Sequence, residues 1–195
     1  MALRPRHTLG AIGLLALTFL VAFAAAGAGS ADAAKRRAAC DRYGKTAPTE
    51  LQLDQARRSI LCLINKKRRA AGLPRLERNA RLDAAAQRHN EQMDGTGCFA
   101  HECPGEGDLS QRLEGVSYLI GGLLQWAFGE NVAWGEGSRG TPKSIMAAWM
   151  ASPGHRANIL NRSYRDIGIG FSQGTPNSAD ARGGIYTTDF GMRRN

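Results

Sequence analysis

The sequence predicts an α+β domain in which helices cover an antiparallel sheet, and two patterns indicate this class. Apolar residues recur at helical spacing in the first half of the chain, over 48–71 and again from Asn79. Two segments near the C-terminus, Asp166 to Ser172 and Gly184 to Phe190, are rich in β-branched and aromatic residues and approach a period of two. Helices therefore come first and between, and strands come late, which is an α+β order.

Two amphipathic helices are predicted before the middle of the chain. The first runs from Pro48 to Ala71 without a breaker after its first turn, and a Gly-Leu-Pro stretch ends it. The second begins near Asn79, a residue type favoured as an N-cap, and carries apolar residues on one face as far as Met93. His89 lies on that apolar face, so we expect it to be a packed, hydrogen-bonded core histidine.

The middle of the chain is expected to alternate loops with short elements. Residues 95–107 are dense in Gly, Pro and Cys and form a loop that displays His101. A short helix is expected from Asp108 to Glu114, and a strand over GENVAWG, residues 129–135. Between them, Val116 to Phe128 is mainly apolar, but two glycines interrupt it and it is too short to span a membrane.

A further helix and a hairpin complete the expected domain. Thr141 followed by Pro142 is typical of a helix start, with proline at the first helical position. Pro153-Gly154 is expected to stop that helix. The polar stretch 174–183 then joins the two late strands as the turn of a hairpin.

The N-terminal segment has the order of a secretory signal peptide. Two arginines precede an apolar run from Leu9 to Ala28, and small residues follow with a cleavage pattern that ends at Ala33. The run is close to the length of a spanning helix, but its Ala and Gly content and the cleavage pattern favour removal. We expect a signal peptide at 1–33, an N-terminal segment at 34–47 and one domain at 48–195, secreted to the extracellular space or cell envelope without a stable membrane span.

The chain is strongly basic, with a formal net charge of +9 over 195 residues. Cleavage after Ala33 removes two arginines and one aspartate and leaves +8. Such a charge raises encounter rates with polyanions such as cell-wall polymers or acidic membranes. The basic residues are spread through every segment rather than gathered in a stripe with aromatic residues, so no nucleic-acid partner is expected.

Four cysteines remain after cleavage, and an even number in an exported chain predicts disulfides. Of the three pairings, spacing favours Cys98 with Cys103 inside one short loop flanked by glycines. Cys40 would then tie the N-terminal segment to the first helix at Cys62. The competing interpretation is a metal site formed by Cys98, His101 and Cys103, which an oxidising compartment disfavours.

Six motifs stand in order along the chain. They are LCLINKKR at 61–68, FAHECP at 99–104, GENVAWG at 129–135, AAWMASPGHRANILN at 147–161, IGIGF at 167–171 and YTTDFG at 186–191. Together they resemble bacterial domains of the CAP superfamily, the type found in cysteine-rich secretory proteins, antigen five and plant pathogenesis-related proteins. The resemblance covers nearly the whole mature chain and implies a three-layer α-β-α sandwich with a central antiparallel sheet and a cleft.

The resemblance also implies which residues meet in that cleft. Carried over by motif, the two histidines are His101 and His155, and the first acid is Glu130 of the GEN triplet. Asn131 of the same triplet is expected as a neighbour of the cleft. Only tertiary folding could bring these residues together, because they are far apart in the sequence.

The second acid that the family usually has is absent from this sequence. It normally stands three residues after a helix tryptophan, and counting from Trp149 leads to Ser152. Ser152 is therefore expected only as a neighbour of the cleft. Glu102 or Glu136 could supply the missing carboxylate if the loops bring one of them near.

The expected cleft suits a divalent cation. Two neutral imidazoles, those of His101 and His155, together with a carboxylate can hold Zn²⁺ and leave one position open for water. Without a second carboxylate to orient a ligand histidine, zinc should bind weakly, and no other cofactor is expected. The alternative is a purely structural polar cluster, in which Glu130 holds a loop and the side chains after His155 bond to a turn.

Three functions are compatible with these residues. The first, which we expect, is a non-enzymatic extracellular module that binds a lipid, a cell-wall fragment or a protein partner in the cleft or along Leu119 to Phe128, where Trp126 could line a groove. The second is a metal-assisted hydrolase of peptides or esters in which Glu130 acts as the general base. No Ser or Cys nucleophile with a neighbouring base can be named, so no catalytic residue is assigned. The third is a structural or protective secreted protein.

Overall fold

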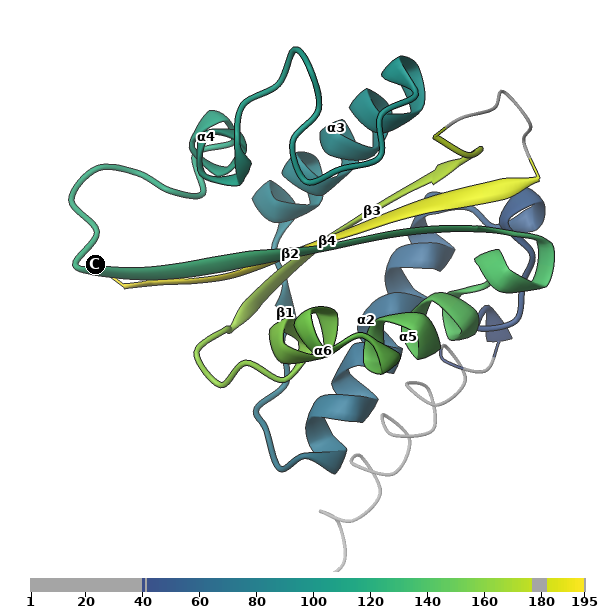
Figure 1. Ribbon diagram of the computed structural model, residues 1–195. Coiled ribbons are helices and arrows are strands. Elements are labelled where there is room, and N and C mark those ends of the chain that lie inside the picture. Colours follow the sequence, from purple (N-terminus) through teal and green to yellow (C-terminus); the bar gives the residue numbers. More distant parts are fainter. Residues whose placement is uncertain (1–39, 41, 177–181, 195) are drawn as a thin grey trace, which may run out of the picture.

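The computed structural model describes Cys40, residues 42–176 and residues 182–194. The expected signal peptide at 1–33 and residues 34–39 of the expected N-terminal segment lie outside the described residues. Within the described part, helices pack on both faces of one sheet and form three layers (Figure 1). The predicted α+β sandwich is confirmed.

Four strands form the sheet, in the spatial order β1-β3-β4-β2. Their bounds are Glu77–Arg78 for β1, Gln125–Glu136 for β2, Asp166–Gln173 for β3 and Gly183–Arg194 for β4. β4 lies antiparallel between β3 and β2, so the predicted hairpin is present, and β1 adds a short parallel pairing to β3. The sheet is therefore mixed with an antiparallel centre, and β2 forms one of its edges.

Helices from both halves of the chain cover the sheet. One face carries α2 (Leu53–Ala70), α5 (Pro142–Ala151) and α6 (Pro153–Ile159), and the other carries α3 (Ala80–Thr96) and α4 (Leu109–Gly115) (Figure 1). Two 3-10 turns, η1 (Pro48–Glu50) and η2 (Gly137–Gly140), precede α2 and follow β2. None of the helices in the described residues combines the length and the apolar character that crossing a membrane requires.

The sheet divides the hydrophobic core into separate clusters. The largest joins α2 and α5 to the sheet and includes the fully buried Ile60, Trp149 and Phe190. A smaller cluster under α3 and α4 includes Leu82 and Leu113. Burial of one such side chain contributes about 1.5–3 kcal/mol, so apolar contact holds both helical layers on the sheet.

α3 lies close to β3 because two glycines of the IGIGF motif face it. A Cβ atom at Gly168 would collide with the backbone of Leu82, and one at Gly170 would collide with the backbone of Ala86. Ile167 and Ile169 alternate with these glycines, so they point to the opposite face, into the largest core. The motif therefore sets the distance between a helix and a strand.

One predicted helix boundary differs from the structure, and one predicted stop also begins a further helix. The helix expected over 48–71 is divided, because Pro48 opens a 3-10 turn and α2 starts at Leu53 after an extended Gln52. The stop expected at Pro153 is correct for α5, which ends at Ala151, but the same proline also begins α6. Proline suits that place because the first N–H groups of a helix have no partner within it.

The outer edge of β2 is covered by side chains from the helices and from the loop before β3. The carbonyl oxygen of Phe128 accepts from the Tyr164 hydroxyl at 2.9 Å. The carbonyl oxygens of Glu130 and Val132 accept from Asn158 at 2.9 Å and from the Trp149 indole at 3.2 Å. These alternate carbonyls point away from β4, as in any antiparallel edge strand.

Both predicted disulfides are formed. Cys40–Cys62 joins the N-terminal segment to α2, with Cα atoms 5.4 Å apart. Cys98–Cys103 closes the loop after α3, with Cα atoms 5.9 Å apart. The sulfur atoms are therefore not available as thiolates, and the metal site considered for Cys98, His101 and Cys103 is excluded in this oxidised form.

Candidate functional site

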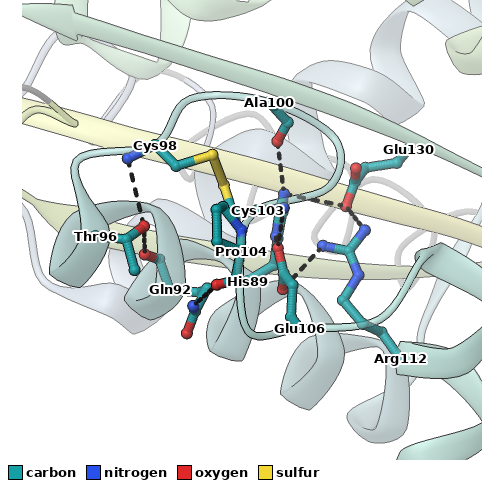
Figure 2. Close-up of a disulfide and its surroundings, with 10 residues drawn as sticks. All are labelled: His89, Gln92, Thr96, Cys98, Ala100, Cys103, Pro104, Glu106, Arg112 and Glu130. Carbon is teal, nitrogen blue, oxygen red and sulfur yellow. Dashed lines mark hydrogen bonds and ion pairs between the residues drawn. A yellow bond between two sulfur atoms is a disulfide. The ribbon is translucent and has the colours of Figure 1, made fainter.

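The loop between α3 and α4 carries His101. Figure 2 shows the disulfide and the hydrogen bonds that hold this loop in place. Gly97 ends α3 in the left-handed conformation, which glycine adopts without strain. The Cys98–Cys103 disulfide then closes the first part of the loop. The side-chain amide of Gln92 in α3 donates to the carbonyl of Pro104. The loop is thereby held against α3 on the face of the sheet that α4 also covers.

The structure brings His101 to Glu130 of β2. Nδ1 of the ring lies 2.7 Å from Oε1 of Glu130. The His101 side chain is 59% exposed and that of Glu130 is 2% exposed, so an accessible ring contacts a buried carboxylate. The hydrogen bond with Glu130 raises the pKa of His101, although partial burial of the ring opposes this.

Arg112 of α4 contacts the other oxygen of Glu130. Its guanidinium donates to Oε2 of Glu130 at 2.7 Å, and Nη1 lies 3.5 Å from Oε2 of Glu106 (Figure 2). The Arg112 side chain is 7% exposed, so it is a buried cation between two carboxylates. Burial opposes ionisation of Glu130, but the hydrogen bond from His101 and the charge of Arg112 lower the pKa of this carboxyl below its ordinary value.

His89 of α3 is completely buried beneath the same loop. Its Nδ1 lies 2.7 Å from Oε1 of Glu106, and its Nε2 lies 3.1 Å from the carbonyl oxygen of Ala100. Oε1 of Glu106 also accepts the backbone N–H of Cys103 at 3.0 Å. Burial lowers the pKa of His89, and the neutral ring can donate from only one of these two nitrogens. The predicted hydrogen-bonded core histidine is confirmed, and it ties the disulfide loop to α3.

Asp189 of β4 stands opposite Glu130 in the sheet register and is completely buried. Neither oxygen of its carboxyl accepts a hydrogen bond from an N–H or O–H group of the described residues, and a hydrogen bond with the carboxylate of Glu130 requires a proton on Asp189. Burial, together with the charge of Glu130, raises the pKa of Asp189 well above its ordinary value. The environment therefore favours the neutral form of Asp189 next to an ionised Glu130.

His155 approaches β2 from the opposite face of the sheet. It lies in the first turn of α6, and its carbonyl oxygen accepts from the Asn131 side chain at 3.0 Å. The Asn158 amide donates to the Asn131 side chain and to the Glu130 carbonyl, at 2.9 Å each. Burial and the charge of His101 lower the pKa of His155. The two imidazoles therefore lie within electrostatic range, although no hydrogen bond joins them within the described residues.

The carboxyls found around Glu130 are not those suggested by the sequence. Ser152, at the family's position for the second acid, is the N-cap of α6. Glu102 is exposed next to His101, and Glu136 lies at the last position of β2. Glu106 and Asp189 take the places near Glu130 instead.

A metal ion held by the whole cluster does not fit this geometry. Among the described residues, no group of three or more His, Cys, Asp or Glu side chains is placed so that it could hold one. One oxygen of Glu130 contacts His101, and the other contacts the positive guanidinium of Arg112. A shared site of Glu130 and both imidazoles would therefore have to displace Arg112. A weak zinc site formed by His101 and His155 alone stays a prediction.

A groove lies farther along the same face of β2, beside α4. It has a volume of about 450 Å³ and is lined by Ser110, Glu114, Leu119, Ile120, Gly121, Leu123, Trp126 and Phe128. Trp126 is 55% exposed and stacks on Phe128, with ring centroids 5.4 Å apart. Phe128 packs in turn on the buried cluster under α3 and α4. The groove therefore has an apolar wall that is fixed to the core.

Sequence reasoning missed Arg112, Glu106 and Asp189 as members of the cluster, whereas Asn158 is one of the side chains after His155 that the structural alternative expects to bond to a turn. Asp189 lies inside a recognised motif, so its polar side chain within YTTDFG was the signal that could have identified it. Arg112 and Glu106 carry no such signal, because a charged residue in a loop or short helix is normally solvated.

Comparison with known proteins places the chain among related sequences. The family model of the cysteine-rich secretory protein family, CAP, matches residues 61–190. The uncharacterised protein YkwD of Bacillus subtilis is 28% identical over 160 residues, which are 81% of this chain and 55% of that protein. This chain therefore spans about half the length of that relative.

Solved structures show the same fold. An extracellular protein containing an SCP domain from Bacillus anthracis is 26% identical, with a TM-score of 0.55 over 71% of this chain and 40% of that chain. An outer surface protein from Borrelia burgdorferi is 21% identical, with a TM-score of 0.56 over 69% of this chain and 90% of that chain. Because the family match spans most of the chain and includes the motifs that carry His101, Glu130 and His155, the chain belongs to the cysteine-rich secretory protein family, CAP.

Proposed function

We propose that the chain is a secreted, non-enzymatic binding module that holds an apolar ligand, such as the acyl chain of a lipid, in the groove between α4 and the start of β2. The observation that supports this most strongly is the exposed Trp126 stacked on Phe128. Among the described residues, three of the five exposed large apolar side chains lie within 120–126, at Ile120, Leu124 and Trp126. Contiguous exposed apolar side chains are typical of interaction sites.

The groove has the size and chemistry of a ligand site. Its volume of about 450 Å³ falls in the range of small-molecule pockets. Leu119, Leu123 and Phe128 provide apolar walls, whereas Ser110 and Glu114 supply polar groups. A ligand with an apolar chain and a polar head that donates hydrogen bonds would match both parts. The acidic Glu114 disfavours a second negative charge directly beside it.

Secretion is supported by two independent observations. Both disulfides are formed, and disulfides persist mainly in oxidising compartments outside the cytosol. Relatives of the same fold include proteins described as extracellular and as an outer surface protein. The N-terminal pattern that we read as a signal peptide agrees with this compartment.

The state of Glu130 favours binding over hydrolysis. An effective general base has a pKa near the working pH and a free oxygen that can reach water. The pKa of Glu130 is lowered, and its two oxygens are engaged by His101 and Arg112. The cluster around Glu130 supports a role in holding the disulfide loop and α4 against β2.

Binding of a fluorescent monoacylglycerol analogue, whose uncharged head donates hydrogen bonds, to delipidated protein tests the proposal. The parent should bind saturably, and Trp126→Ala should lower the affinity by about tenfold or more, because an aromatic wall of the groove is lost. Trp134→Ala is the matched control, since Trp134 lies near the other end of β2, is 40% exposed and does not line the groove. Absence of saturable binding, or equal losses in the two variants, would contradict the proposal.

A further inference from the structure

We propose that a surface formed by the last turn of α2 and the loop before β3 binds a linear polymer that carries phosphate groups. We call this surface the basic end. Its members are all exposed, and they are Lys66, Lys67, Arg69, Arg162 and Arg165. The basic end lies on the side of the sheet that α2 covers, whereas the groove lies on the side of α4 (Figure 1).

A buried arginine brings the two segments of the basic end together. Arg68 is completely buried, and its guanidinium donates to the carbonyls of Ile159 and Asn161 at 2.9 and 2.8 Å. It also donates to the carbonyls of Pro74 at 2.9 Å and Tyr164 at 3.4 Å. The guanidinium of Arg68 is therefore hydrogen-bonded inside the protein and is not part of the exposed surface. These bonds fix the loop before β3 against the last turn of α2.

The loop before β3 is ordered by a second arginine. Nη1 of Arg165 donates to the carbonyls of Arg162, Ser163 and Tyr164 at distances from 2.7 to 3.2 Å. Burial is the main cause that lowers the pKa of Arg68, and the positive charge of Arg165 lowers it further. The two guanidinium groups therefore lie close together. Residues almost 100 positions apart in the sequence thus contribute to one positive surface.

The charges of the basic end are not compensated by acids. In the part of the chain that the structure describes, no carboxylate forms an ion pair with Lys66, Lys67, Arg69 or Arg162. Glu77 is an exposed acid close to Arg165, since its backbone N–H donates to the carbonyl of Arg165 at 2.8 Å, and it offsets one charge at most. Asp166, the next residue, accepts from the Tyr118 hydroxyl at 2.7 Å. A concentrated positive field attracts polyanions.

The first half of α2 behaves differently. Arg58 pairs with Asp54 at 3.6 Å, and Arg57 lies 3.8 Å from the buried Asp83. The same helix therefore neutralises its basic residues at one end and leaves them unpaired at the other. Basic residues in the last turn also complement the helix dipole, but this explains only Lys67 and Arg69 and not the arginines of the loop before β3.

The surface chemistry favours a polymer over a membrane. Stable attachment to a bilayer normally combines basic residues with apolar side chains that insert. The exposed large apolar residues of the described chain are Phe99, Ile120, Leu124, Trp126 and Trp134, and none belongs to the basic end. Arginine presents a fork that matches phosphate oxygens, and lysine binds phosphate as a point charge, so repeated phosphate groups fit this set.

The test is binding of fluorescently labelled long-chain inorganic polyphosphate to the purified chain, measured by anisotropy at several salt concentrations. The triple variant Lys66→Gln, Lys67→Gln, Arg69→Gln should bind about tenfold or more weakly. The slope of log K against log salt concentration should become smaller in magnitude by about 2. Each phosphate neutralised on a single strand contributes about 0.7 to this slope, and the variant removes three positive charges. The matched triple Arg81→Gln, Arg88→Gln, Arg139→Gln removes equal charge from exposed residues elsewhere and should change the affinity by less than about threefold.

A single substitution provides a second test in case the triple variant does not fold. Arg162→Gln should weaken polyphosphate binding measurably and leave the melting temperature unchanged, because the exposed Arg162 side chain forms no hydrogen bond or ion pair within the described residues. Equal losses in the two triple variants would overturn the proposal, because net charge alone would then explain binding. Equally tight binding of phosphatidylglycerol vesicles or of polyglutamate would also overturn it, since the surface would not select a phosphate polymer.

Discussion

Trp126 and Glu130 point to the same face of β2, four residues apart, yet their surroundings are opposite. Around Glu130 the charged side chains of Arg112 and Glu106 are 7% and 12% exposed and contact one another. Around Trp126 the apolar side chains are exposed and border a groove. Glu130, which lies in a motif, contacts side chains of the disulfide loop and of α4. The exposed apolar surface around Trp126 belongs to a segment outside the motifs.

The path of the chain explains this difference. The disulfide loop and α4 pass over the middle of β2 and place Arg112 on Glu130. After α4 the chain turns at Ser117, which has a positive φ of 58°, and reaches β2 at Gln125 without another helix. The first residues of β2 therefore lack the cover that the middle of the strand receives, and Trp126 and Phe128 form the wall of a groove.

The largest effect is expected for Arg112→Met at neutral pH. Loss of one partner in a buried charge pair leaves Glu130 and Glu106 uncompensated, so the free energy of unfolding should fall by about 3–5 kcal/mol. Arg58→Met is the matched control, because Arg58 forms an exposed pair with Asp54 and should cost less than about 0.5 kcal/mol. Urea unfolding of both variants measures the difference. Similar losses in the two would mean that the cluster is not the structural brace we describe.

Zinc binding tests whether the histidines near Glu130 are free to coordinate a metal ion. The parent should bind Zn²⁺ weakly and lose binding as the pH falls through the pKa of His101, which the hydrogen bond with Glu130 raises above its ordinary value, because histidine must be neutral to ligate. Ser152→Glu should raise the affinity about 10–100-fold if this position reaches His155, and His155→Ala should abolish binding. Titration calorimetry gives both values. An unchanged signal in His155→Ala would place the metal elsewhere.

A smaller effect is expected from the pH dependence of His101. Its pKa is raised in the folded state by the hydrogen bond with Glu130, so its contribution to stability is full below its unfolded pKa of about 6.5. The contribution is lost as the pH rises through the folded-state pKa. The destabilisation in His101→Gln should therefore be larger near about pH 5.5 than near about pH 8.5, and below about 1 kcal/mol because the ring is largely exposed.

The pKa of His89 is shifted in the opposite direction to that of His101, so the parent and the His101→Gln variant must be measured side by side. Burial lowers the pKa of His89, so both the parent and His101→Gln should lose stability as the pH falls below about 6.5. The difference between them isolates His101. A difference that stays constant with pH would show that the His101–Glu130 contact does not depend on the charge of the ring.

The smallest effect is expected for the stability of Trp126→Ala. Because Trp126 is more than half exposed, its removal should change the free energy of unfolding by no more than about 0.5 kcal/mol, while the expected affinity for the ligand falls about tenfold or more. Urea unfolding without ligand measures this value. A loss above about 2 kcal/mol would mean that Trp126 belongs to the core, and the contrast with Glu130 would disappear.

Local patterns account for the parts of the fold that could be predicted. Asn79 caps α3 by accepting the N–H of Arg81 at 3.0 Å, and Thr141 caps α5 by accepting the N–H of Ser144 at 3.4 Å. The extension of β2 back to Gln125 could not be read from an apolar stretch broken by glycines. It depends on pairing with the end of β4, where Gln125 stands opposite Arg194.

The candidate site was only partly predictable for a related reason. The motifs identify His101, Glu130 and His155, since each lies in a recognised sequence pattern. The contact of Arg112 with Glu130 depends on where a seven-residue helix lies on the sheet, and no periodicity encodes that position. The family motif assigns the position of the missing second acid to Ser152, but the sequence could not show that Glu106 would lie near Glu130.

The covered carbonyls of β2 also have a consequence for how copies of the protein meet. An edge strand normally offers its unpaired backbone groups to a strand of another molecule, which is how many proteins begin to aggregate. In the middle of β2, the oxygens of Phe128, Glu130 and Val132 already accept hydrogen bonds from Tyr164, Asn158 and Trp149. A foreign strand would have to displace these three donors before it could pair there. The middle of this sheet edge is thereby protected against the addition of a foreign strand.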